Sequence, residues 1–311
     1  MGRRSEEKRD AQAEKRGRVL NDMKLGLILE GGASRTCFSN GVMDVLMDEK
    51  IRADYIIGAS AGIANGASYA SWQRGRAHEI SREYMVDPRY MGARYLFQKN
   101  NKSFYNIKFV FDEVPNHLVP YDYAALKAYP GELVACVTRL KTGQAEYLKV
   151  TAEDTRWKVL QASCALPILF QPVKIDGKYY MDGGIADSIP IEQAIRSGCN
   201  KNIVVLTRER SYLKEESRTT RLAARIYRKY PQFAEALLTR AKRYNANRRR
   251  VFELEKEGKA FVIEPQDIGG FKRTESSPDK LEALYQQGID CAEARMEQLR
   301  AYLEAPLGGT V

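Results

Sequence analysis

The sequence is notably poor in histidine. Its 311 residues include only two, His78 and His117. In α/β-hydrolases the catalytic histidine comes after the nucleophile and the acid in the chain. A late catalytic histidine of that kind is therefore excluded. His117 could serve an active serine only by folding back over it, and we interpret His78 as structural.

Paired cysteines and long apolar runs are also missing. The five cysteines are widely scattered and form no C-x-x-C pair, which argues against a disulfide framework or a zinc site and favours a reducing compartment. No uninterrupted apolar run reaches the roughly 18 residues of a membrane-spanning helix. Residues 1–20 lack the apolar core of a secretory signal, and Glu6 breaks the myristoylation pattern. We expect a cytoplasmic protein with a charged N-terminal tail over residues 1–20.

Positive charge is concentrated in one segment. Residues 208–250 hold fourteen Lys and Arg against four Glu, a net charge of +10 that equals that of the whole chain. The pattern predicts two helices separated near Pro231. Basic amphipathic helices suit peripheral contact with an anionic membrane, although a solvated helical face is the other interpretation. No nucleic-acid-binding motif accompanies the charge, so no nucleic acid partner is expected.

The segment from Asp54 to Ser68 has the pattern of a buried strand, a tight turn and a helix. Ser60 lies at the turn, with Gly58 and Gly62 two residues to either side. This G-x-S-x-G pattern is typical of a nucleophile elbow, in which a serine hydroxyl projects from a sharp strand-to-helix turn. Glycines on both sides remove Cβ atoms that would collide there. The motif also occurs by chance in small-residue loops, but its context favours a catalytic serine.

A glycine-rich loop, Glu30–Arg35, follows an apolar strand at residues 24–29. It lacks both the G-x-G-x-x-G fingerprint of dinucleotide sites and the Gly-Lys-Ser/Thr end of a P-loop. Because the elbow follows on the next strand, the loop is best interpreted as an oxyanion hole whose N–H groups face Ser60. Arg35 either orients this loop or meets a phosphate, or is an ordinary surface arginine.

Asp182 is the candidate base for Ser60. It follows a hairpin predicted at residues 174–181 and precedes Gly183 and Gly184. Taken alone, Asp before Gly is more often an Asx turn. A serine hydroxyl needs a base, however, and the scarcity of histidine makes a carboxylate the expected one.

Residues 87–129 show no clear periodicity and are rich in Phe and Tyr. An aromatic insertion next to a reactive serine is a candidate lid or acyl-chain pocket. A second layer of core over the sheet is the other interpretation. Further along the chain, residues 279–303 have helical spacing and are predicted to close the fold.

Three motifs together resemble the patatin-like phospholipase family, in particular its bacterial cytoplasmic members: Glu30-Gly31-Gly32-Ala33-Ser34-Arg35, Gly58-Ala59-Ser60-Ala61-Gly62 and Asp182-Gly183-Gly184. The resemblance implies an α/β protein with a three-layer α/β/α fold and a mostly parallel central sheet. Residues 21–207 would be the catalytic domain, and residues 208–311 a basic helical region packed on it.

The resemblance also implies a mechanism. Ser60 would be the nucleophile and Asp182 its proton acceptor, with the oxyanion hole at Gly31, Gly32 and Ala33. Supporting roles fall to Arg35, Gly58, Gly62, Gly183 and Gly184. The implied reaction is hydrolysis of a fatty acyl ester through an acyl-enzyme, without metal or cofactor. The sequence makes no prediction of oligomeric state.

The glycine-rich loop departs from the family pattern, which usually reads Gly-Gly-Gly-x-Arg-Gly. Here Ala33 and Thr36 replace the third and last glycines. Alanine keeps its N–H, but a positive φ at Ala33 would strain the loop. The alternative hypothesis is therefore a catalytically impaired protein of the same fold that binds anionic lipid surfaces.

Overall fold

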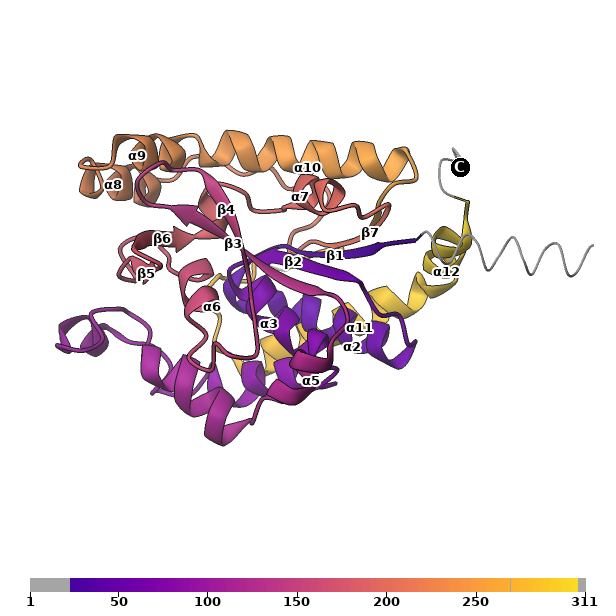
Figure 1. The fold of residues 1–311 in the computed structure, drawn as a ribbon, viewed down its shortest axis with the longest axis horizontal. Helices are drawn as coiled ribbons and strands as arrows, with labels where there is room; N and C mark the ends of the chain where they lie inside the picture. The colour runs from indigo at the N-terminus through magenta and orange to yellow at the C-terminus, as the bar shows by residue number, and fades with distance from the viewer. Residues whose placement is uncertain (1–22, 269, 307–311) are drawn as a thin grey trace, which may run out of the picture.

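A computed structural model describes residues 23–268 and 270–306, so the charged tail over residues 1–20 lies outside the described part of the chain. Its centre is an eight-stranded sheet in the order β5-β6-β3-β2-β1-β7-β8, with β4 paired to β3 (Figure 1). The strands are β1 (Leu25–Leu29), β2 (Tyr55–Ala59), β3 (Glu132–Arg139), β4 (Ala145–Lys149), β5 (Val173–Ile175), β6 (Lys178–Asp182), β7 (Lys201–Val205) and β8 (Phe261–Ile263).

The sheet is mostly parallel. Strands β3, β2, β1, β7 and β8 run in the same direction, whereas β4 and β6 are antiparallel to β3, and β5 to β6. Every residue of β1, β2 and β7 is buried, as expected when helices cover both faces of a parallel sheet. The predicted hairpin turns at Asp176 and Gly177, whose φ angles of 46° and 77° suit a tight two-residue turn.

Helices cover both faces of the sheet (Figure 1). On one face lie α2 (Cys37–Asp48), α3 (Ala61–Ala70) and α11 (Pro278–Ala294); on the other lie α7 (Ile191–Arg196) and α10 (Arg240–Lys256). Within β1, Leu27 and Leu29 belong to the first core, while Ile28 between them packs into the second. This alternation places one hydrophobic core on each side, and the predicted three-layer α/β/α architecture is confirmed.

The C-terminal part of the chain contains more helices than the sequence predicted. Residues 208–250 hold three rather than two: α8 (Arg218–Ile226), α9 (Pro231–Leu238) and α10. The helix predicted over residues 279–303 is interrupted at Arg295, where α12 (Met296–Glu304) follows α11. Strand β8 extends the sheet by pairing with β7, and α11 packs against α2. None of the helices in the described ranges is both long and apolar enough to cross a membrane.

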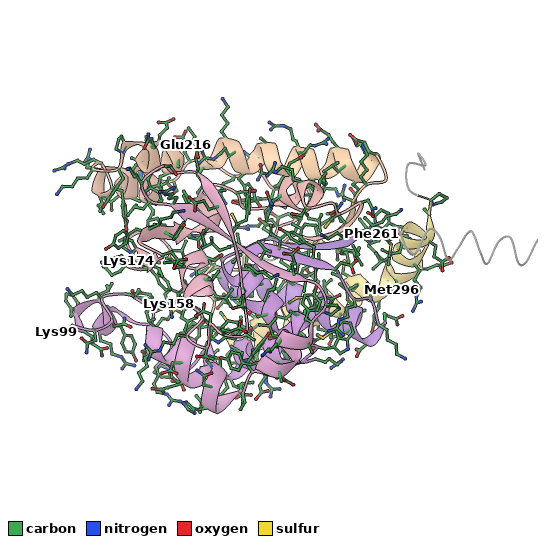
Figure 2. All side chains as sticks on the ribbon, in the orientation of Figure 1. Lys99, Lys158, Lys174, Glu216, Phe261 and Met296 are labelled. Atoms are coloured by element: carbon green, nitrogen blue, oxygen red, sulfur yellow. The ribbon has the colours of Figure 1, made fainter. Side chains whose placement is uncertain are left out.

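The aromatic insertion folds into short helical pieces, among them a π-helical segment over Phe109–Leu118 and α5 (Tyr123–Ala128). Phe109 and Phe111 are buried, whereas Phe97 is 87% exposed. The insertion therefore combines a packed inner layer with a loop that extends away from the body of the molecule. The labelled Lys99 marks this loop in Figure 2.

Candidate active site

Ser60 occupies the sharp turn between β2 and α3. Its backbone angles are φ 54° and ψ −137°, a strained conformation for a residue with a side chain. The Ser60 N–H donates to the Ser163 hydroxyl at 2.9 Å, and that hydroxyl donates to the carbonyl of Cys136 at 2.7 Å. Contacts from α6 (Lys158–Ser163) and β3 thus hold the turn in the geometry of a nucleophile elbow.

The elbow glycines are required by close approach to β1. A Cβ at Gly58 would lie 2.5 Å from the carbonyl oxygen of Leu29, and one at Gly62 would lie 2.6 Å from that of Glu30. Gly31 is equally restricted, since its Cβ would come within 3.0 Å of the Cβ of Ser60. The glycine-rich loop and the elbow are therefore in direct contact, as their order in the sequence led us to expect.

Asp182 ends β6, opposite Val137 of β3. It is 1% exposed, and its Oδ1 accepts a 2.8 Å hydrogen bond from the N–H of Gly184. Its Oδ2 has no hydrogen-bond partner within the described ranges. A Cβ on Gly183 would lie only 2.0 Å from the carbonyl oxygen of Cys136. The Gly-Gly turn thus fixes the carboxylate while leaving one of its oxygens available.

The environment of Asp182 makes its carboxylate more basic than usual. Burial raises its pKa, while the charge of Arg240, the Ser60 hydroxyl and the Gly184 N–H oppose that rise. Both Ser60 and Asp182 line the same pocket. A more basic carboxylate beside a serine hydroxyl is a suitable proton acceptor.

The glycine-rich loop presents unused backbone donors near Ser60. Among the residues that the structure describes, the N–H groups of Gly31, Gly32 and Ala33 find no acceptor, whereas the N–H of Ser34 donates to the carbonyl of Arg273 at 3.1 Å. All three residues line the pocket that contains Ser60. Their arrangement is compatible with binding of an oxyanion.

The departures from the family loop pattern are linked to each other. Ala33 has φ 50°, so the loop does adopt the left-handed conformation that disfavours alanine. The Thr36 hydroxyl donates to the Ala33 carbonyl at 2.7 Å and accepts from the Asn65 side chain at 2.9 Å. Thr36 therefore ties the strained residue to α3, a compensation that local sequence patterns did not reveal.

Neither histidine lines the pockets around Ser60. His78 stacks on the ring of Tyr285 with centroids 3.6 Å apart, and its Nε2 lies 3.1 Å from a Glu282 oxygen. This confirms its structural role. His117 is exposed. No group of three or more His, Cys, Asp or Glu side chains within residues 23–268 and 270–306 is arranged to hold a metal ion.

Two pockets of contrasting chemistry meet at Ser60, and Ala33 and Leu166 also line both. The larger, of about 1010 Å³, is mainly apolar and will be called the apolar pocket. Its wall combines α3 with the aromatic insertion and α6, including Ala64, Tyr90, Tyr105, Phe111, Val114 and Leu160. The smaller, of about 480 Å³, will be called the cationic pocket, and its basic side chains are Arg35, Arg208, Lys214, Arg240 and Arg273.

The cationic pocket combines Arg35, which the sequence singled out, with basic residues that sequence reasoning missed. Arg35 is only 6% exposed, so it is not a surface arginine. Arg240 donates from Nε to the carbonyl of Gly184 at 2.7 Å, beside Asp182. Arg208 and Lys214 also turn inward. The excess positive charge of residues 208–250 was visible in the sequence, but the side to which each cation points depends on the tertiary structure.

Comparison with known proteins agrees with this geometry. The family model for patatin-like phospholipase matches residues 27–195, which include the glycine-rich loop, Ser60 and Asp182. The chain belongs to the patatin-like phospholipase family. A second model, a domain of unknown function (DUF6363), matches residues 230–304.

Individual relatives are distant and only partly covered. The uncharacterised protein YjjU of Escherichia coli is 26% identical over 189 residues, which are 59% of this chain and 52% of YjjU. Lysophospholipase NTE1 of Scheffersomyces stipitis is 26% identical over 200 residues, 60% of this chain but 12% of NTE1. The chain thus spans about half of the first relative and a small part of the second. The crystal structure of VipD from Legionella pneumophila shares the fold, with a TM-score of 0.52 at 13% identity, covering 89% of this chain and 67% of VipD.

Proposed function

We propose that the protein is a serine hydrolase that cleaves fatty acyl esters of lipids through an acyl-enzyme. The observation that carries the proposal is the pairing of a strained elbow serine with a buried carboxylate, Asp182, in one pocket. The free Oδ2 of Asp182 supports its assignment as the base. Membership of the family and the lysophospholipase relatives support the substrate class.

In this mechanism Asp182 takes the proton from Ser60 as Oγ attacks the acyl carbonyl. The N–H groups of Gly31, Gly32 and Ala33 stabilise the negative oxygen that develops. Asp182 then returns the proton to the leaving alcohol. Water, activated by the same carboxylate, hydrolyses the acyl-enzyme and releases the fatty acid. The apolar pocket accommodates the acyl chain during both steps.

The two parts of the chain contribute to one catalytic unit in this proposal. Residues 21–207 supply Ser60, Asp182 and the glycine-rich loop, and residues 208–311 supply Arg240, Arg273 and other cations to the same pocket. Arg240 also binds the Gly184 carbonyl next to the proposed base.

Labelling with a fluorophosphonate probe, read by intact mass, tests the nucleophile. We expect one adduct on the wild-type protein and none on Ser60→Ala, with Ser276→Ala, an exposed serine outside both pockets, labelled like wild type. Hydrolysis of acyl esters should follow the same pattern. No adduct on folded wild-type protein would contradict the hydrolase and favour the impaired, lipid-binding alternative.

A specific surface feature supports contact with a lipid membrane. Helices α8 and α9, the β5–β6 hairpin and the loop marked by Lys99 lie at the same end of the long axis (Figures 1 and 2). These segments and their connections carry most of the exposed large apolar side chains: Phe97 (87%), Leu213 (69%), Ile226 (55%), Leu222 (52%) and Tyr179 (48%). Exposed Arg218, Arg221 and Arg225 accompany them on α8.

We propose that this end lies on an anionic membrane, with apolar side chains inserted and arginines near lipid phosphates. Sedimentation with vesicles of phosphatidylcholine and phosphatidylglycerol tests this. Binding should fall with added salt and should be weakened by Leu222→Ser with Ile226→Ser. The control is Leu118→Ser, an exposed leucine on a different segment. Binding that is insensitive to salt and to the α8 variant would contradict the contact.

A further inference from the structure

The cationic pocket gathers five basic side chains from four separate segments of the chain. Arg35 follows β1, Arg208 and Lys214 follow β7, Arg240 lies on α10, and Arg273 follows β8. Among the residues that the structure describes, only two carboxylates line the same pocket, Glu30 and Asp182. The pocket adjoining the candidate nucleophile is therefore strongly positive.

Within the described residues these cations lack direct carboxylate partners. In the described part of the chain, none of the five forms an ion pair with a carboxylate. Both oxygens of Glu30 are already engaged, one by the Tyr244 hydroxyl at 2.5 Å and the other by the Thr207 N–H at 2.7 Å. The Nε atoms of Arg35 and Arg208 are buried and have no described acceptor. Donors thus remain available inside the pocket.

The cations also disfavour one another's charge. Burial and the charge of Arg240 lower the pKa of Lys214 to about 7, although Glu30 opposes the shift. Burial and the charge of Arg208 lower the pKa of Arg35 to about 10. Part of the cost is offset by aromatic contacts, since Lys214 Nζ lies 4.1 Å from the centroid of the Tyr244 ring. An anion in the pocket would relieve the remaining repulsion.

We propose that the cationic pocket binds a phosphate monoester on the substrate, so that the preferred substrates are fatty acyl esters with a phosphorylated head group. This assignment rests on the proposed function for the position of the scissile ester at Ser60. Guanidinium groups match phosphate oxygens with two parallel hydrogen bonds, and a doubly charged monoester balances several cations at once. A choline phosphodiester would instead bring another cation into a pocket that is already positive.

The decisive experiment compares three oleoyl esters dispersed below their critical micelle concentrations, so that no charged interface contributes. They are lysophosphatidate, lysophosphatidylcholine and monooleoylglycerol. For the wild-type protein we expect kcat/KM to be about tenfold or more higher for lysophosphatidate than for the other two, the effect of at least one charge-assisted hydrogen bond. Lys214→Met, which keeps an unbranched apolar side chain, and Arg273→Gln, at an exposed position, should each lower this preference by about tenfold.

The control is Arg249→Gln, which removes an exposed charge on α10 outside both pockets and should keep the wild-type preference. Isothermal titration with inorganic phosphate and with glycerol phosphate provides an arm that does not depend on turnover. Wild type and Ser60→Ala should both bind, and Lys214→Met should bind more weakly. Circular dichroism melts establish that each variant is folded.

The possible results separate this inference from the proposed function. Equal hydrolysis of all three esters, with no phosphate binding, would overturn the phosphate site while leaving the hydrolase intact. Binding of inorganic phosphate without preference for lysophosphatidate would overturn the head-group assignment and identify a site for free phosphate. Phosphate binding in a protein that neither reacts with a fluorophosphonate nor hydrolyses any ester would support the site and reject the hydrolase.

Discussion

The apolar and cationic pockets meet at Ser60 but are built in different ways. The apolar pocket draws on α3, α6 and the aromatic insertion, all within residues 33–170. The cationic pocket combines segments from residue 30 to residue 273. Each pocket suits a different part of an acyl ester, and only the second depends on the C-terminal part of the chain. In the proposed function, specificity for the acyl chain and for the head group should therefore be alterable independently.

The largest expected effect comes from changing the proposed base, on which turnover depends whatever occupies either pocket. Asp182→Asn keeps the shape of the side chain but cannot accept a proton, so we expect a loss of kcat of about 10⁴-fold for every ester, whatever its head group. Steady-state hydrolysis measures this loss. Asp176→Asn, in the turn of the same hairpin, is the matched control and should keep wild-type rates. Retained activity in Asp182→Asn would remove the dyad assignment.

Filling the apolar pocket should separate binding of the acyl chain from the chemical step at Ser60. Ala64 lies on α3 in the wall of this pocket. Ala64→Phe should lower kcat/KM for palmitoyl esters by about 100-fold because the displaced chain misplaces the carbonyl. Acetyl esters should react within about twofold of wild type. Ala128→Phe, at an exposed site on α5, is the control. An equal loss for both chain lengths would mean that the pocket does not hold the acyl chain.

The pH dependence tests the link between the cationic pocket and the base. Asp182 must be ionised to accept a proton, and burial raises its pKa, so activity should fall with decreasing pH from above the ordinary value of 3.8. The charge of Arg240 lowers the same pKa. Arg240→Gln should therefore move the acid limb of kcat/KM upward by about one pH unit, and Arg240→Lys should restore it. If the acid limb of kcat/KM were unchanged in a folded Arg240→Gln protein, Arg240 would have a packing role and no influence on the pKa of Asp182.

The smallest expected effect concerns the loop at the junction of the two pockets. Ala33 has φ 50°, and replacing it by glycine removes a penalty of about 1–2 kcal/mol for the left-handed conformation. Greater freedom of the unfolded chain offsets about 0.4–1 kcal/mol of this gain. Chemical denaturation should therefore show Ala33→Gly to be more stable by about 0.5 kcal/mol. The control is Ala128→Gly, in a helix, which should lower the stability instead. If Ala33→Gly also lowered the stability, the backbone of Ala33 would not be strained.

The layers and central sheet could be predicted from the sequence because their signals are local. Continuous apolar runs indicated the parallel strands, and the three glycine-containing motifs placed the turns between strands and helices. The break between α11 and α12 at Arg295 was missed because the apolar spacing continues across it.

Within the site, the spacing of the motifs was enough to single out Ser60 and the glycines as candidates. Asp182 became a candidate only because the scarcity of histidine made a carboxylate base the expected one. The sequence did not single out the basic residues of the cationic pocket, because Arg208, Lys214 and Arg240 lie in a segment rich in other basic residues, most of which are exposed although Arg248 is buried. Composition records the charge of a segment but not the direction of its side chains. The sequence identified Thr36 only as a departure from the family pattern. Its hydrogen bond to the Ala33 carbonyl could not be predicted, because it depends on the positive φ of Ala33, which the sequence raised only as one possibility.

The position of Ser60 between two pockets also gives the reaction an order. In the proposed mechanism, cleavage leaves the fatty chain attached to the serine in the apolar pocket, while the freed alcohol occupies the cationic pocket. The alcohol departs first, and its exit opens the route by which water reaches the acyl group from the side of Asp182. In this mechanism the head group is recognised by the cationic pocket and also blocks the access of water until it leaves. A phosphorylated alcohol that dissociates slowly would attack the acyl-enzyme and re-form the original ester.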